Sequence, residues 1–86
     1  MEIKILKFGA TWCQPCRVID PIIKEVEKET GIESLSFDSD TDVSYFTEYK
    51  VMSVPTIIIT VNGEQKERIT GITPKARLIS LINKYK

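Results

Sequence analysis

The chain has only two cysteines, Cys13 and Cys16, and they are three residues apart. Two thiols at this spacing are close enough to form a small disulfide ring and to open it again. An apolar run from Ile3 to Phe8 precedes the pair and a run with helical periodicity follows it, so the pair lies at a strand-to-helix junction. Backbone N–H groups at a helix start favour an anion and can lower the pKa of a cysteine from about 8.5 to about 3.5–7.5. The pattern therefore predicts thiol–disulfide exchange, with Cys13 available as a thiolate.

Size and charge exclude several other classes of function. A chain of 86 residues is expected to form one domain, spanning residues 1–86. Twelve Lys and Arg residues balance twelve Asp and Glu residues, which argues against a nucleic-acid or membrane-surface partner because either would favour a basic excess. No apolar stretch reaches the roughly 20 residues that span a bilayer, and the charged start is too short for a signal peptide. We expect a cytoplasmic monomer.

The chain contains no histidine, so histidine acid–base catalysis and histidine metal ligands are excluded. Two cysteines cannot complete a four-cysteine zinc site within one chain, and we expect no resident metal. They could still form half of a site shared across a dimer, and this alternative stays open. In a reducing compartment a lone close pair is more often catalytic than structural.

The elements that position the pair follow from periodicity and turn residues. Strands are predicted at 1–8, 34–38, 54–61 and 64–70, and helices at 16–29, 40–49 and 74–84. Asn62-Gly63 predicts a tight hairpin turn, and Pro21 predicts a kink in the first helix. Thr73 is the expected cap of the last helix. Core-facing positions are predicted at Val18, Ile19, Ile22, Ile23, Val26, Ile72, Leu78, Leu81 and Ile82. The predicted fold class is α/β, a four-stranded mixed sheet with three helices on its faces.

Several sequence blocks resemble thioredoxins. They are Phe8 to Arg17 with its Trp-Cys-Gln-Pro-Cys motif, Pro21 in the following helix, Tyr49 to Thr56 with its Val-Pro-Thr, Asn62-Gly63-Glu64, and Gly71. The resemblance covers essentially the whole chain. It implies a thioredoxin fold that lacks the N-terminal strand and helix of full-length thioredoxins, which is the core that thioredoxins share with glutaredoxins.

The resemblance also implies roles for individual residues. Cys13 would attack as a thiolate, and Cys16, more buried, would resolve the mixed disulfide. The Cys13–Cys16 redox-active disulfide would be the only redox group, with no further cofactor. Pro55 would be a cis proline facing the two sulfurs. The expected substrate-binding residues are Trp12, Pro15, Val54, Pro55 and Gly71.

The chain departs from the usual thioredoxin residues at four positions: Lys7, Ser36, Gln14 between the two cysteines, and Ser53 before Val54-Pro55. Many thioredoxins bury an aspartate where this chain has Lys7, and the lysine that often pairs with it is replaced by Ser36. Lys7 could be a cation that stabilises the thiolate, or its stem could pack while its ammonium reaches water or Asp38. Asp38 and Asp40 could accept the Cys16 proton, or could be a solvated strand end and a helix cap. Lys7 and Asp38 are thus candidates for tuning thiol pKa values.

The resemblance implies that disulfide-containing proteins are the substrates, with ribonucleotide reductase as a client by family analogy, and that a thioredoxin-reductase-like enzyme donates electrons. A glutathione-dependent, glutaredoxin-like enzyme is the first alternative. The motif opposes it, because glutaredoxins usually have Cys-Pro-x-Cys and a glutathione-holding segment that is Gly71-Ile72-Thr73 here. The second alternative is a dimeric module that binds zinc or an iron–sulfur cluster through Cys13 and Cys16.

Overall fold

Strands and helices alternate in the first two-thirds of the chain, and a hairpin and a helix complete it. The computed structural model describes residues 2–86, so the predicted strand start at Met1 lies outside the described residues. The elements are β1 (Ile3–Gly9), α1 (Gln14–Thr30), β2 (Glu33–Asp38), α2 (Val43–Glu48), β3 (Thr56–Val61), β4 (Glu64–Thr70) and α3 (Lys75–Asn83). The predicted set of four strands and three helices is therefore confirmed.

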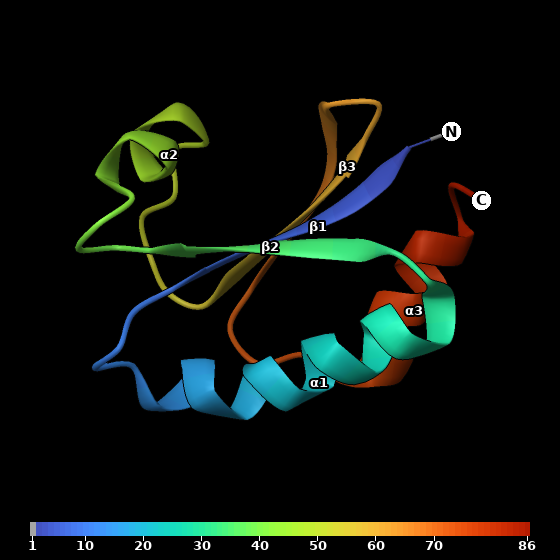
Figure 1. Cartoon of the computed structure of the whole chain (residues 1–86), viewed down its shortest axis with the longest axis horizontal. Coiled ribbons are helices and arrows are strands. Elements are labelled where there is room, and N and C mark those ends of the chain that lie inside the picture. The colour runs from blue at the N-terminus through green and yellow to red at the C-terminus, as the bar shows by residue number, and fades with distance from the viewer. Residues whose placement is uncertain (1) are drawn as a thin grey trace.

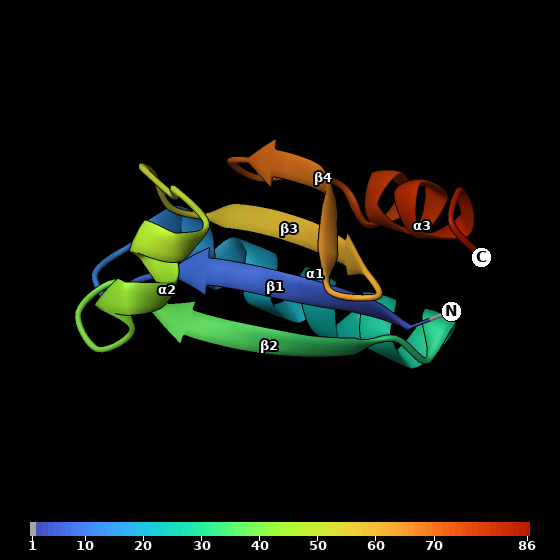
Figure 2. The same cartoon turned by 90° about the horizontal axis from the view of Figure 1, so that it is seen from above.

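The strands form one mixed sheet in the order β2-β1-β3-β4 (Figure 2). β1 pairs with β2 in parallel and with β3 antiparallel, and β3 pairs antiparallel with β4. The β3–β4 turn has positive φ at both Asn62 (53°) and Gly63 (82°), as the Asn-Gly pair predicts for a two-residue hairpin. The central strands β1 and β3 carry the site at their ends.

Helices cover the two faces of the sheet unequally (Figure 1). α1 and α3 lie together on one face, where the main core consists of buried aliphatic residues: Ile3, Ile5, Ile19, Ile23, Val26, Ile57, Ile59, Val61, Leu78 and Ile82. The short α2 lies on the other face at one end of the sheet. There Phe8 is fully buried against the rings of Phe37, Phe46 and Tyr49, with centroids 5.0, 5.1 and 5.6 Å away.

The first helix is longer than its periodicity predicts. It begins at Gln14 because Cys13 is its N-cap, and it continues through Pro21 to Thr30. Gly31 ends it in the left-handed conformation, as expected for a C-cap glycine. The prediction that Val18 faces the core is wrong: the buried positions are Cys16, Ile19, Ile23 and Val26, and Val18 lies beside that stripe, half exposed.

The other differences are at element ends. α2 is shorter than predicted, because Ser39 to Thr41 form a turn and Asp42 is the N-cap, so the helix begins only at Val43. β3 begins at Thr56 rather than Val54, since a proline cannot donate a ladder hydrogen bond. Thr73 does not cap α3: it is buried, and Pro74 occupies the N-cap position without a side-chain hydrogen bond. Ile72 is exposed, not in the core as predicted.

Candidate active site

The two cysteines are joined in a disulfide at the start of α1, with their Cα atoms 5.3 Å apart. Cys13 is extended, with φ −90° and ψ 110°, and its Sγ accepts a hydrogen bond of 3.2 Å from the backbone N–H of Cys16. This is the geometry of an N-cap side chain, which satisfies a backbone donor that the helix leaves unpaired. The Cys13 sulfur therefore occupies the place where a helix start stabilises negative charge.

Local sequence explains this placement. The backbone N–H of Cys13 donates to the carbonyl of Ala10 at 3.2 Å, which closes a tight turn between β1 and α1. Pro15 follows in the first turn of the helix, where a missing N–H costs nothing and a fixed φ favours the helix. The two cysteines are 4% and 3% exposed in the disulfide form, so Cys16 is only marginally more buried than Cys13.

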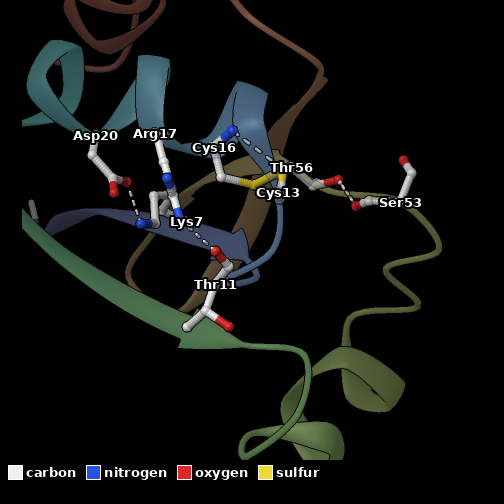
Figure 3. The surroundings of a disulfide bond; sticks show 8 residues. All are labelled: Lys7, Thr11, Cys13, Cys16, Arg17, Asp20, Ser53 and Thr56. Atoms are coloured by element: carbon white, nitrogen blue, oxygen red, sulfur yellow. Dashed lines mark hydrogen bonds and ion pairs between the residues drawn. A yellow bond between two sulfur atoms is a disulfide. The ribbon is translucent and has the colours of Figure 1, made fainter.

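The segment before β3 packs against the disulfide. The Val54–Pro55 peptide bond is cis, as the resemblance implies. Val54 packs against the buried cluster of Ala10, Cys13 and Cys16. The Thr56 hydroxyl donates to the Ser53 carbonyl at 2.7 Å and stabilises the bend (Figure 3). Residues 53–55 thus form one wall of the site.

Gly71 joins this wall from the end of β4. Its N–H donates a hydrogen bond of 2.9 Å to the Pro55 carbonyl, and its φ is +83°, a conformation that favours glycine. The structure therefore brings Val54, Pro55 and Gly71 together, and their role in substrate binding stays a prediction.

An apolar groove of about 200 Å³ lies beside the disulfide, lined by Trp12, Ser39, Phe46, Val51, Met52, Ser53 and Val54. Trp12 is 66% exposed and Met52 is 95% exposed, so two large apolar side chains are open to solvent at one site. Met52 is not among the site residues that the sequence predicts. The signal was an apolar residue directly before the Ser-Val-Pro segment, in a loop that provides no core position for it.

Lys7 binds a partner that sequence reasoning did not name. It lies on the same face of β1 as Ile3 and Ile5, and its side chain is only 14% exposed. Its Nζ forms an ion pair with Oδ1 of Asp20 on α1 (Figure 3), so the prediction that the ammonium points toward Asp38 is wrong. The missed signal was the four-residue spacing between Cys16 and Asp20, which puts both on one helix face.

Asp38 lies across a cavity of about 410 Å³ that Cys16, Lys7 and Asp20 also line. Its Oδ1 accepts a hydrogen bond of 2.8 Å from the backbone N–H of Asp40. Asp38 is thus near Cys16, with its carboxylate engaged in its own loop.

Two further findings concern other kinds of site. Among residues 2–86, no cluster of three or more His, Cys, Asp and Glu residues has an arrangement suited to a metal ion. In the same part of the chain, no helix is long and apolar enough to cross a membrane.

Known proteins match this chain over almost its whole length. A family model described as Thioredoxin matches residues 1–84. A thioredoxin of Listeria monocytogenes is 40% identical over 80 residues, which are 91% of this chain and 78% of that protein. Thioredoxin M5, a chloroplastic protein of Oryza sativa, is 39% identical over 83 residues, and the chain spans 48% of its length.

A solved structure supports the same assignment. A mutant thioredoxin from Halobacterium salinarum superimposes with a TM-score of 0.93 at 28% identity, covering 98% of this chain and 74% of that one. The four-stranded sheet with three helices is therefore a thioredoxin fold. Together with a cysteine pair at disulfide distance, these matches identify a thiol–disulfide oxidoreductase, and the chain belongs to the thioredoxin family.

Proposed function

We propose that this chain reduces disulfides in other proteins through its Cys13/Cys16 dithiol. The observation that carries the proposal is the Cys13 sulfur at the N-cap of α1, where it accepts the Cys16 N–H, next to an exposed apolar rim. The helix start favours the thiolate, and the rim provides a surface for a polypeptide rather than for a small disulfide.

The reaction takes place in two exchanges. The Cys13 thiolate attacks one sulfur of the client disulfide, forms a mixed disulfide and releases the other client sulfur as a thiolate. Cys16, one helical turn away, then attacks Sγ of Cys13. The Cys13–Cys16 disulfide forms, the mixed disulfide breaks, and the client leaves with both sulfurs reduced. Two electrons move from the dithiol to the client, so an external dithiol donor must reduce the enzyme again.

In this proposal Trp12, Val54, Pro55 and Gly71 hold the client backbone. The Val54 side chain packs on the disulfide, and the Gly71–Pro55 hydrogen bond orients the adjoining loop. Pro15 stiffens the turn between the cysteines. A thioredoxin-reductase-like enzyme would supply the electrons. Protein disulfides, such as that of ribonucleotide reductase, would receive them. The protein would act as a monomer in the reducing cytoplasm. The support for these partners is family membership.

The test is reduction of insulin by dithiothreitol with and without the protein. The wild-type protein should accelerate insulin precipitation, and Cys13→Ser should abolish the effect. Cys16→Ser should accumulate a mixed disulfide that dithiothreitol releases. Unchanged insulin precipitation with the wild-type protein would contradict the proposal.

A second assay separates the thioredoxin and glutaredoxin functions. Turnover with NADPH and a thioredoxin reductase supports the proposal. Turnover of hydroxyethyl disulfide with glutathione and its reductase alone would favour a glutaredoxin-like enzyme instead.

A further inference from the structure

A cavity of about 410 Å³ lies behind the disulfide, on the side of Cys16. Its charged lining comes from every element around it: Lys7 from β1, Arg17 and Asp20 from α1, Asp38 at the end of β2, and Asp42 at the start of α2. The proposed reaction requires Cys16 to lose a proton before it attacks Cys13. The cavity is therefore the place to look for the proton acceptor.

Gly9 lies between the Lys7 stem and the Cys16 sulfur. A β carbon added at Gly9 would lie 3.3 Å from Cys16 Sγ and 3.7 Å from Lys7 Cε. The sulfur and the lysine stem thus border the same small space, which the missing side chain leaves open. The ammonium at the end of that stem is bound to the Asp20 carboxylate (Figure 3).

Asp20 and Cys16 lie on the same face of α1, one turn apart. The Lys7 side chain is largely buried, whereas that of Asp20 is 46% exposed. The carboxylate is thus fixed at one oxygen by a cation from the sheet, and it keeps access to solvent. A carboxylate in this position can receive a proton through water and pass it on.

The other charged groups of the cavity have local partners. Asp38 accepts from the Asp40 N–H at 2.8 Å. Asp42 accepts from the Asp38 N–H at 2.8 Å and from the Thr41 hydroxyl at 3.4 Å. Arg17 donates to the Thr11 carbonyl at 3.3 Å. Histidine is absent from the chain, so no imidazole competes for the role.

We propose that Asp20, held in place by Lys7, accepts the proton of the Cys16 thiol through water in this cavity during the step that closes the disulfide. The inference rests on the proposed reductase function. In this step the Cys16 S–H proton passes to water and then to the Asp20 carboxylate, and the Cys16 sulfur bonds to Cys13 Sγ. The client sulfur leaves with its bonding electron pair. Lys7 is a positioning residue, and its positive charge also favours the thiolate form of Cys16.

The test uses the reduced full chain and the disulfide reagent DTNB in stopped flow. Cys13 attacks the reagent and releases one thionitrobenzoate, and Cys16 then displaces the second from Cys13. The two releases give two phases of visible absorbance, so the two exchanges are timed separately. In Asp20→Asn the first phase should be unchanged. The second should slow by on the order of tenfold at neutral pH, and its pH profile should move to higher pH.

Matched variants make the result specific. Glu25→Gln removes another exposed carboxylate of α1 and should leave both phases unchanged. Asp20→Glu keeps the carboxylate, so its second phase should be nearly as fast as that of the wild type. If Asp20 acted only through packing, the longer Glu side chain would not be expected to perform better than Asn. Circular dichroism of each variant confirms that it is folded.

The experiment distinguishes a failure of the Asp20 inference from a failure of the proposed reductase function. If the second phase in Asp20→Asn matches that of the wild type in rate and pH profile, or if Asp38→Asn slows it instead, Asp20 is not the acceptor. If the wild-type protein releases no thionitrobenzoate at all, the proposed reductase function fails as well.

Discussion

The backbone N–H of Cys16 donates a hydrogen bond of 3.2 Å to the sulfur of Cys13. A single helix turn therefore links the two reacting residues, but their sulfurs have different environments. Cys13 lies at the cap, where the Cys16 N–H points toward its sulfur, whereas Cys16 lies inside the helix with its sulfur beside Gly9. The two thiols of the reduced protein should differ in reactivity as a consequence.

Alkylation of the reduced protein tests this difference. At neutral pH, iodoacetamide should modify Cys13 about tenfold faster than Cys16, because stabilisation at the helix start increases the thiolate fraction. Mass spectrometry of peptides from a time course gives both rates. The single variants Cys13→Ser and Cys16→Ser are the controls, and a Cys13 as slow as free cysteine would contradict the prediction.

Gly71→Ala should reduce both stability and turnover. A methyl at φ +83° costs about 1–2 kcal/mol, and it also lies next to the Pro55 loop where a client would dock. Gly31→Ala is the matched control, since Gly31 also has positive φ (72°) and an added β carbon meets no atom within 4 Å at either glycine. Urea unfolding should show similar losses for both variants, and only Gly71→Ala should slow insulin reduction. Equal turnover in the two variants would remove Gly71 from the docking surface.

Met52→Gln should weaken turnover of protein substrates selectively. Its side chain is 95% exposed beside Trp12, and covering it in a complex would contribute roughly 1 kcal/mol, or about fivefold in kcat/KM. Small disulfides do not reach this rim, so the DTNB reaction should be unchanged. Val43→Gln, at an exposed apolar residue outside the groove, is the control. A loss with DTNB equal to the loss with insulin would mean that Met52 acts on the cysteines and not on docking.

Phe8→Ala should destabilise the chain by about 3–5 kcal/mol. Phe8 is fully buried and its ring contacts those of Phe37 on β2, Phe46 on α2 and Tyr49 at the end of α2, so its removal leaves a cavity between the sheet and α2. Denaturant unfolding measures the loss, and Phe8→Leu should lose less because it leaves a smaller cavity. Similar losses for both variants would show that the lost ring contacts, rather than the size of the cavity, determine the destabilisation.

The pair formed by Glu67 and Tyr85 should make stability depend on pH. The Tyr85 hydroxyl donates to the Glu67 carboxylate, which lowers the pKa of Glu67 below its ordinary 4.5 and raises that of Tyr85 above 10.0. The contribution of Glu67 to the free energy of unfolding is therefore present above the pKa that Glu67 has in the unfolded chain. It is lost as the pH falls through the pKa that Glu67 has in the folded chain. The contribution of Tyr85 is present below its unfolded pKa and is lost as the pH rises through its folded one.

Tyr85→Phe should accordingly lower the thermal midpoint at neutral pH and have little effect in strong acid, where Glu67 is protonated in both states. Thermal unfolding followed by circular dichroism across pH measures this difference. A loss that is constant from neutral to strongly acidic pH would show that Tyr85 contributes through packing alone.

Sequence patterns sufficed where a single local interaction decides the structure. The Asn62-Gly63 turn follows from the ease with which both residues adopt positive φ. The Cys13 cap follows from the position of a polarisable acceptor directly before a helix, with a proline in its first turn. The buried stripe of α1 follows from its period, although Val18 shows that one residue at the edge of such a stripe can face solvent.

Contacts between segments far apart in the chain could not be predicted from local sequence patterns. Lys7 interrupts an apolar strand face, and the sequence offered several acidic partners for it. Which carboxylate it meets depends on how α1 is rotated against β1 and on the space that Gly9 leaves beside Cys16, and these are properties of the packed structure. The exposure of Met52 likewise depends on where α2 ends relative to the disulfide.

The order of the elements, the cysteine pair and its position before a helix are all predictable from sequence, because they depend on residues close together in the chain. The packed structure was needed to show that Asp20, rather than Asp38, binds Lys7, and that the Gly71 N–H donates to the Pro55 carbonyl. Those contacts bring together residues 13 to 16 positions apart, and the packing of helices on the sheet selects among partners that sequence alone leaves equivalent.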